Sequence, residues 1–474
     1  MILTNINHDC GYHTQKIATM FFPLERISDS GVSDINVITE KKDSIITVSA
    51  RVYSKERTLS AVSGDDTAHD LSVLMFRVLS DLTGFEPPWG ILYGVRPARL
   101  MHATVQKLGI DGARRKFDFD LVKPQKTELA LEVMQRENKI IELSKDNSFS
   151  LYVSIPFCPT RCSYCSFVSH SIANAGEYIA PYVDLLCREL EETAKVAKDL
   201  SLRLETIYFG GGTPTTLSAE QLAKIMQTIS DNFDLSTLRE YTVEAGRPDT
   251  VTPEKLQTVR SLGADRVSIN PQTFSDEVRA KVGRRHTTEQ TLSAFDMARG
   301  AGFDNINMDF IAGLDGETLQ SFQSGIDRAV ALGADSVTVH NLALKSAAYL
   351  VTENEYFDLT AKNTASAMVD YAYKALCKNG YAPYYMYRQS KSLGNLENVG
   401  YAKDGKECLY NIYMMDETHT VLAAGAGAVT KLRGASYNNI ERVYNFKYPY
   451  EYIQRFDQVI LRKQKVYDFY SHIK

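Results

Sequence analysis

The sequence has no long apolar run and no strong excess of charge of either sign. No apolar stretch approaches the roughly 20 residues of a membrane-spanning helix, so we expect no membrane span. A formal net charge of −5 over 474 residues gives no reason to expect a nucleic-acid partner. Residues 1–10 lack the basic and then apolar pattern of a secretory signal. These absences predict a globular cytoplasmic protein, and the length suggests roughly three domains.

Cysteine is also scarce, but three of the seven cysteines lie in one short segment. Cys158, Cys162 and Cys165 form a C-x3-C-x2-C pattern, which in a chain without a secretory signal favours metal binding over disulfides. Three thiolates at this spacing can bind three irons of a 4Fe-4S cluster. The fourth iron then lacks a cysteine ligand and is open to S-adenosylmethionine (SAM). We expect the four scattered cysteines to pack as small hydrophobic residues.

The organisation of the chain changes twice along its length. Residues 1–125 predict an α+β domain, with paired strands near 35–39 and 44–53 and a helix over 71–82. Residues 126–380 predict the central domain, which ends in a helix over 357–379. Residues 381–474 are rich in tyrosine and predict a smaller C-terminal α+β appendage.

The central domain alternates between strand and helix patterns. The expected strands are 151–155, 206–209, 241–244, 266–269, 305–311 and 336–342, and the clearest helical patterns between them are 179–190, 218–229 and 318–332. Six β-α units predict a parallel sheet with helices outside, and six are too few to close an eight-stranded barrel. The predicted fold class is therefore α/β, a partial (β/α)6 barrel whose functional residues lie at the carboxyl ends of the strands.

Candidate ligand-binding residues follow these strands. The glycine-rich turn 210–215 lacks the G-x-G-x-x-G spacing of a dinucleotide site and the lysine of a phosphate loop, so it suits the amino acid end of SAM instead. Glu244 and Asp309 end or nearly end strands, where carboxylates need partners and could bind an amino group or ribose hydroxyls. Gln272 follows the fourth strand, and Arg284 could pair with a carboxylate in a bidentate fork.

These motifs together resemble the radical SAM family of oxygen-independent coproporphyrinogen III oxidases. The resemblance runs from about residue 148 to the segment 425–429. It rests on the cysteine trio with its preceding Tyr-x-x-Ile-Pro-Phe, the turn 210–215, and the segments 283–286 and 309–314. The segments 88–97 and 269–273 are similar to the coproporphyrinogen dehydrogenase branch known as HemZ.

The resemblance implies cofactors and site residues. Cys158, Cys162 and Cys165 would bind the cluster, and one SAM molecule, with a second possible, would bind nearby. The positions that match SAM contacts are Tyr152, Tyr164, Gly211, Gly212, Thr213, Glu244, Gln272, Arg284, Asp309, Ala343 and Val429. The implied reaction converts propionates of coproporphyrinogen III to vinyl groups in haem biosynthesis. It needs an electron donor such as a flavodoxin or a ferredoxin.

Two departures leave other functions open. Phe167 stands where the oxidases have a further cysteine, and Asn270-Pro271 stands where they have Gly-Val. The first departure also resembles the haem chaperones of the same superfamily, and a radical SAM methyltransferase or ring-opening enzyme acting on haem is a second alternative. For a tetrapyrrole substrate, Arg96 and Arg99 are candidate propionate clamps, and Trp89 is a candidate aromatic contact for the macrocycle.

Overall fold

The chain packs as two compact units that are discontinuous in sequence. The computed structural model describes residues 1–474 except 95, 168, 344–358, 435–438 and 472–474. The first unit comprises Met1–Met134, Asn341–Tyr371 and Met386–Asn398, and the second comprises Gln135–His340, Ala372–Tyr385 and Val399–Lys474. The three consecutive domains expected at 1–125, 126–380 and 381–474 stay a prediction.

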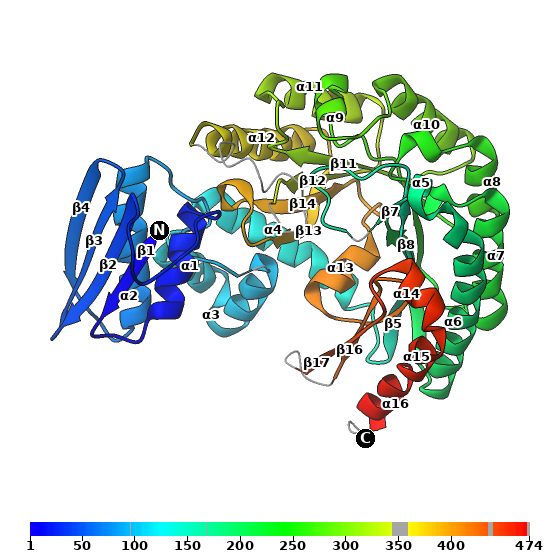
Figure 1. Cartoon of the computed structure of the whole chain (residues 1–474), viewed down its shortest axis with the longest axis horizontal. Helices are drawn as coiled ribbons and strands as arrows, with labels where there is room; N and C mark the ends of the chain where they lie inside the picture. The colour runs from blue at the N-terminus through cyan, green and yellow to red at the C-terminus, as the bar shows by residue number, and fades with distance from the viewer. Residues whose placement is uncertain (95, 168, 344–358, 435–438, 472–474) are drawn as a thin grey trace. The chain divides into compact units, whose positions relative to one another are not determined.

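The first unit is built on a four-stranded sheet. Its strands are β1 (Ile2–Ile6), β2 (Ile35–Lys42), β3 (Ile45–Val52) and β4 (Lys55–Val62), in that order across the sheet (Figure 1). The helices α1 (Gly11–Phe21) and α2 (Thr67–Thr83) pack with β3 around a core of alternating buried strand residues. Asp66 caps the start of α2, and Gly84 ends it at φ 66°. The predicted strand pair and helix are confirmed.

The Trp89 side chain belongs to the core of this unit. It is 0% exposed, and its indole nitrogen donates a hydrogen bond of 2.7 Å to Glu397. Lys126 also donates to Glu397, at 2.6 Å, and the guanidinium of Arg388 lies 5.5 Å from the indole ring centroid. The prediction that Trp89 contacts a macrocycle is wrong, because this ring has no exposed face.

Helices complete the first unit. They are α3 (Pro97–Phe119), α4 (Pro124–Ile141, which continues into the second unit) and α12 (Leu359–Lys378, likewise shared). The predicted helix over 357–379 is confirmed from 359, and residues 357 and 358 lie outside the described residues. Arg96 is the residue that precedes the first turn of α3, and Arg99 lies in that turn. Their role as propionate clamps stays a prediction.

The second unit contains an open sheet of 11 strands in the order β13-β14-β12-β11-β10-β9-β8-β5-β15-β16-β17. Its six central strands are β5 (Ser148–Ile155), β8 (Arg203–Gly211), β9 (Glu240–Glu244), β10 (Arg266–Ser268), β11 (Ile306–Ala312) and β12 (Ser336–Asn341). The pairs from β5 through β11 are parallel. All six predicted strands are confirmed.

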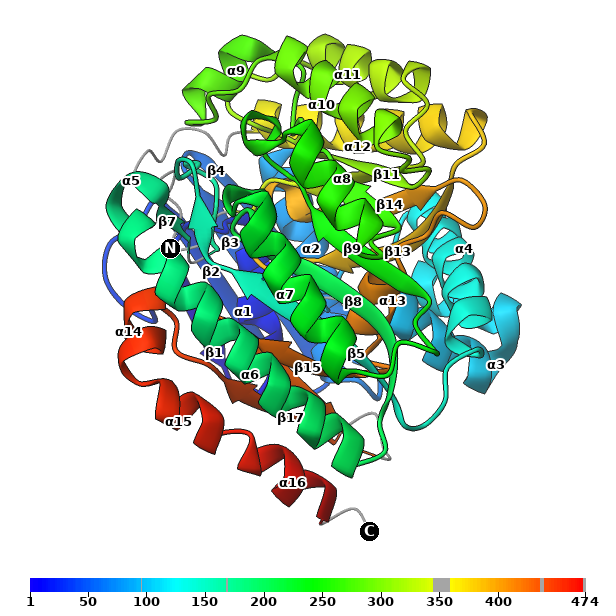
Figure 2. The same cartoon turned by 90° about the vertical axis from the view of Figure 1, so that its right-hand side faces the viewer.

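Helices between these strands cover the outer side of the sheet, as Figures 1 and 2 show. They are α6 (Ile179–Asp199), α7 (Ala219–Asn232), α8 (Pro253–Ser261), α9 (Asp276–Lys281), α10 (Thr288–Gly300) and α11 (Leu319–Ala331). Ser218 and Thr287 form capping boxes at the starts of α7 and α10, which fix where each helix begins. The open sheet with outer helices confirms the predicted partial barrel.

Residues after 381 add strands to both ends of this sheet. β13 (Ala382–Arg388) and β14 (Glu397–Ala402) extend it beyond β12, while β15 (Thr420–Ala424), β16 (Val429–Arg433) and β17 (Ile440–Tyr444) extend it beyond β5. The helix α13 (Leu409–Asp416) lies between these two groups along the chain. The helices α14 (Pro449–Gln454), α15 (Phe456–Leu461) and α16 (Gln464–Ser471) follow β17, and Figure 2 shows them beside α6.

The carboxyl ends of the central strands are where the sequence motifs lie. The cysteine segment follows β5, the glycine turn follows β8, Glu244 ends β9, and Gln272 follows β10. Since parallel strands end at one edge of a sheet, the fold brings these motifs together. None of the described helices is both long enough and apolar enough to cross a bilayer.

Candidate functional site

The cysteine segment is a loop that starts on a two-residue strand. β6 (Phe157–Cys158) pairs with β7 (His170–Ser171), and the backbone N–H of Cys165 donates to the carbonyl of Cys162 at 3.1 Å. All three thiols are free, and burial raises the pKa of Cys158 and raises that of Cys165 to about 11. Metal binding to such thiols releases protons, because the ligand is the thiolate.

The glycine turn packs directly on this loop. The backbone N–H of Gly212 donates to the Ile155 carbonyl at 2.7 Å, and that of Thr213 donates to the Phe157 carbonyl at 2.8 Å. A Cβ at Gly212 would lie 2.6 Å from the Phe157 oxygen and 3.0 Å from the Cys158 sulfur, so no larger residue fits there. Gly211 has a φ of 106°, which favours glycine for a second reason. The turn is therefore a support for the cysteine loop as well as a candidate ligand contact.

Two neighbouring carboxylates, Glu244 at the end of β9 and Asp309 in the middle of β11, have opposite pKa shifts. Burial raises the pKa of Glu244 to about 7, partly offset by the hydroxyl of Tyr208, which donates to it, and the neighbouring Asp309 raises it further. Burial also raises the pKa of Asp309, but His340 and Asn307 lower it more, so the net shift is downward. His340 Nε2 lies 3.8 Å from Asp309 Oδ2, and Asn307 donates to Asp309 at 2.7 Å. This pair of carboxylates suits a ligand that carries an ammonium group or vicinal hydroxyls.

Gln272 has an unusual backbone and an unused acceptor. Its φ is 65°, in the left-handed region that non-glycine residues rarely adopt, and it bridges to β11 through hydrogen bonds with Asp309 and Ile311 of 2.9 and 3.0 Å. Its side-chain oxygen Oε1 is buried and has no hydrogen-bond partner among the described residues. A buried acceptor without a donor is costly unless a ligand supplies one. This atom fits a cofactor that brings a hydroxyl or amino donor.

Arg284 holds the backbone of neighbouring strand ends. It donates to the carbonyls of Gly246 and Asn270, the latter at 2.7 Å, and to the hydroxyl of Tyr164 at 3.2 Å. Its Nε is buried and has no partner among the described residues. The predicted fork with a carboxylate stays a prediction, since Arg284 here links Tyr164 of the cysteine loop to the ends of β9 and β10.

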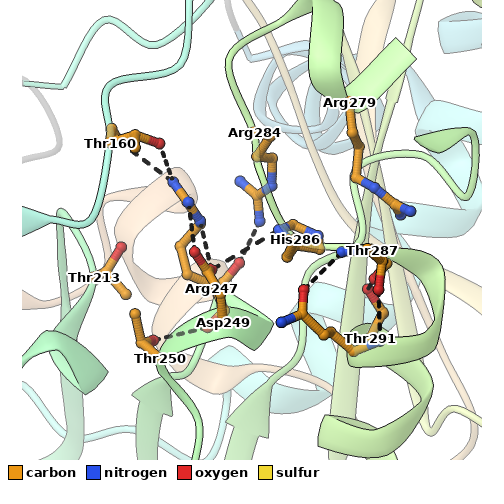
Figure 3. A network of polar contacts seen from close by, with 12 residues as sticks. Thr160, Thr213, Arg247, Asp249, Thr250, Arg279, Arg284, His286, Thr287 and Thr291 are labelled. Carbon is orange, nitrogen blue, oxygen red and sulfur yellow. Dashed lines mark hydrogen bonds and ion pairs between the residues drawn. The ribbon is translucent and has the colours of Figure 1, made fainter. Parts of the chain in front are cut away.

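Arg247 forms a second link to the loop, which the sequence reasoning missed. Figure 3 shows it between Thr160 and Asp249. It pairs with Asp249 through two hydrogen bonds of 3.0 and 2.9 Å, and it donates to the carbonyl and hydroxyl of Thr160 at 3.3 and 3.1 Å. The Thr160 hydroxyl in turn donates to the Gly283 carbonyl at 3.0 Å. The segment Gly-Arg-Pro-Asp after Glu244 was the only sequence signal for this contact.

His286 lies beside this network, as Figure 3 shows. Its Nδ1 is 4.0 Å from Asp249, and both ring nitrogens are buried without a hydrogen bond to any described residue. Burial, and then the positive charges of Arg284, Arg279 and Arg247, lower the pKa of His286 to about 2. The imidazole is therefore neutral.

Three tyrosine rings line the sheet under the glycine turn. Tyr152 stacks on Tyr208 and on Tyr410 with centroid distances of 6.2 and 6.0 Å, and Tyr208 stacks on Tyr410 at 4.5 Å. A Cβ at Gly210 would lie 3.0 Å from the Tyr208 ring. The sequence did not identify Tyr208 and Tyr410 as site residues, because a tyrosine in an apolar segment predicts only packing in the core. Here Tyr208 donates to Glu244, and the ring of Tyr410 stacks on that of Tyr208.

Val429 and Ala343 are the two remaining candidate SAM-binding positions. Val429 begins β16, and the preceding segment packs on the end of β5, where Ser154 donates to the Ala426 carbonyl at 2.8 Å. Ala343 pairs with Ser392 in the first unit, so its approach to the other site residues stays a prediction. Among the described residues, no three His, Cys, Asp or Glu side chains are placed as ligands of one single metal ion. A cluster differs from such an ion, since each thiol would bind its own iron.

Comparisons with known proteins show what the whole chain is similar to. Residues 152–329 match the model of the radical SAM superfamily. The chain is 34% identical to the oxygen-independent coproporphyrinogen-III oxidase-like protein HemZ of Bacillus subtilis, over 97% of this chain and 96% of that protein. It is 30% identical to the heme chaperone HemW of Lactococcus lactis, over 68% of this chain and 79% of that protein. The solved structure of coproporphyrinogen III oxidase (HemN) from Escherichia coli has the same fold, with a TM-score of 0.53, 22% identity and coverage of 68% of this chain and 72% of that chain.

Proposed function

Since the chain belongs to the HemZ-like branch of the oxygen-independent coproporphyrinogen III oxidase family, within the radical SAM superfamily, we propose that it oxidatively decarboxylates propionate side chains of a tetrapyrrole. The proposed substrate is coproporphyrinogen III and the product protoporphyrinogen IX. In each conversion a propionate loses one hydrogen atom, carbon dioxide and one electron, which leaves a vinyl group. The observation that carries this proposal is the match to HemZ over 97% of the chain, which extends to residues before the cysteine loop.

The cofactors are a 4Fe-4S cluster and S-adenosylmethionine, as in the rest of the superfamily. When bound, they supply the one-electron chemistry that removes a hydrogen atom from the substrate. We assign Cys158, Cys162 and Cys165 to three irons of the cluster. A second SAM stays a prediction. The reducing cytosol is the compartment in which such thiols persist, so we propose it as the location.

The side chains around the cysteine loop would then bind and orient SAM. The carboxylate of Asp309 or Glu244 would accept hydrogen bonds from its ammonium or ribose hydroxyls, and Gln272 Oε1 would accept one more. The stacked tyrosines keep water from this side of the site. Arg247, which pairs with the Asp249 carboxylate, and Arg284, whose fork with a SAM carboxylate stays a prediction, both contact the cysteine loop. They hold the loop so that the three thiols keep their spacing.

A haem chaperone is the second candidate function. It is favoured by the match to HemW and by Phe167, which replaces a cysteine of the oxidases and is 65% exposed. A chaperone would bind haem and leave coproporphyrinogen unchanged. A haem methyltransferase or ring-opening enzyme is the third candidate, and methyl transfer would release S-adenosylhomocysteine.

One anaerobic experiment separates these functions. Protein reconstituted with iron and sulfide is incubated with SAM, dithionite and coproporphyrinogen III, and the products are identified by mass spectrometry. We expect protoporphyrinogen IX and carbon dioxide from the parent and neither from Cys162→Ala. Cys10→Ala, which changes a buried cysteine of the first unit, is the matched control and should behave like the parent. Stoichiometric haem binding with an unchanged porphyrinogen would contradict the proposal and support the chaperone.

A further inference from the structure

An aromatic route connects the strand that carries Cys158 to the protein surface. His170 on β7 pairs with Phe157, next to Cys158, and its ring lies edge-on to the rings of Tyr448 and Tyr450, at 5.6 and 6.4 Å between centroids. Tyr448 and Tyr450 stack on each other at 5.5 Å with an interplanar angle of 6°. Tyr450 is 39% exposed, so the route reaches solvent. All of these residues belong to the second unit.

The segments that follow the cysteine loop and β16 carry most of the large exposed apolar side chains of the second unit. Among the described residues of the second unit, five large hydrophobic side chains are exposed, and four of them follow the cysteine loop or lie on β17, α14 and α15. These four are Phe167, Tyr444, Tyr450 and Leu461. Exposed aromatic residues of this kind are enriched at protein interfaces.

The same surface is positively charged. Arg455 and Arg462 both lie on the ring of Phe446, with distances of 4.1 and 4.0 Å to its centroid, and neither forms an ion pair with a described carboxylate. Lys447 and Lys465 are exposed nearby in sequence, whereas the segment from 446 to 465 contains only two acidic residues, Glu451 and Asp457. Burial and the proximity of Arg455 lower the pKa of Arg462. Two like charges held together without a carboxylate suit an anionic partner.

We propose that this surface, which comprises Tyr450, Lys447, Arg455, Arg462 and the neighbouring exposed apolar side chains, docks a small acidic electron-carrier protein with a low-potential flavin or iron–sulfur centre. The inference rests on the proposed radical SAM function. One electron leaves the reduced carrier and enters the cluster through the edge of the loop that His170 contacts, and no atom is transferred. The complementary charges speed association, and the tyrosine pair and His170 fill the space between the carrier and β6 with aromatic rings.

The test measures reduction of the cluster, separately from turnover. Reduced flavodoxin and a reduced acidic 2Fe-2S ferredoxin are the probes, mixed anaerobically with reconstituted protein at low ionic strength, and cluster bleaching is followed by stopped-flow absorbance. The variant carries Arg455→Glu with Arg462→Glu. The matched control carries Lys374→Glu with Lys378→Glu, which makes the same change in net charge on two exposed residues of α12.

We expect the arginine variant to lower the second-order rate constant and the affinity for the oxidised carrier by at least about tenfold, with a weaker dependence on salt. Its iron content and its reduction by dithionite should equal those of the parent, and the lysine control should keep the parent's rate. A variant that the carriers reduce at the parent's rate would overturn the proposal. The proposal would also be overturned if cluster reduction slowed equally in the lysine control, or if neither carrier reduced the cluster of the parent. If the carriers reduce the parent and the variants as expected while the parent does not convert coproporphyrinogen, that result would refute only the proposed decarboxylation.

Discussion

Replacing Arg247 with alanine should loosen the cysteine loop without removing any predicted iron ligand. The Arg247 side chain is 4% exposed and that of Asp249 is 21% exposed, so both are largely withdrawn from water. The substitution removes the two hydrogen bonds to Asp249 and the two to Thr160. The Asp249 carboxylate then stays in place without its cation.

The expected loss of folding stability in Arg247→Ala follows from the largely buried pair of Arg247 and Asp249. A hydrogen bond to a charged group contributes about 1.5–3 kcal/mol, and removing one partner of a buried ion pair costs about 3–5 kcal/mol. Because the four bonds share one guanidinium, their effects do not add. We therefore expect the apparent free energy of unfolding of the cluster-free protein to fall by about 3–5 kcal/mol. Arg247→Lys keeps the charge but not the planar fork, so it should recover only part of the loss.

Urea unfolding followed by circular dichroism measures the loss of folding stability. The rate of iron loss to a chelator from reconstituted protein measures the loosening of the cysteine loop. Iron loss should be faster in Arg247→Ala, since Thr160 lies between two of the predicted ligands. The matched control is Arg114→Ala, which removes a similar bidentate pair with Glu128 in which both side chains are 45% exposed. Equal iron loss from Arg247→Ala and the parent would refute the reasoning that this arginine positions the loop.

Three further predictions address other parts of the chain. Glu244→Ala and Asp309→Ala should keep the iron content but weaken SAM binding, measured by calorimetry, by about 1–3 kcal/mol each, because each removes a half-buried carboxylate that forms hydrogen bonds. Burial lowers the pKa of His419 to about 3, so its neutral form stabilises the fold fully above the unfolded pKa near 6.5, and this stability is lost as the pH falls. Between pH 7 and 5 the parent should lose about 2 kcal/mol that His419→Gln does not, measured by urea unfolding at both values. Trp89→Phe should destabilise the first unit by about 1–3 kcal/mol in thermal unfolding, because Glu397 loses a donor in the core.

Glu254→Ala, at an exposed position of α8, should bind SAM like the parent. Unchanged SAM binding in both carboxylate variants would place the ligand elsewhere. The parent's loss of stability between pH 7 and pH 5, if it is also seen in His419→Gln, would show that another group causes it. If Trp89→Phe unfolds like the parent, the bond to Glu397 contributes nothing to stability.

The sequence by itself determined the alternating strands and helices and the positions of Glu244 at the end of β9 and of Gln272 after β10, and it predicted the cysteine ligands. It could do so because strand and helix periods are local, and because a C-x3-C-x2-C spacing is readable without knowledge of distant contacts. Only the tertiary structure decided what surrounds these residues. The rings of Tyr208 and Tyr410 stack although these residues lie 202 positions apart in the sequence, and no local pattern predicts that contact.

The tertiary structure also decided the roles of two residues that the sequence alone left ambiguous. Trp89 looked suited to a macrocycle, but Glu397, which is distant in the chain, accepts its N–H and the ring is fully buried. Nothing in the sequence singled out Arg247, but it reaches the cysteine loop and donates to Thr160. Both outcomes depend on long-range packing, because whether a polar side chain is exposed or paired is set by the segments that fold against it and not by its own neighbours in sequence.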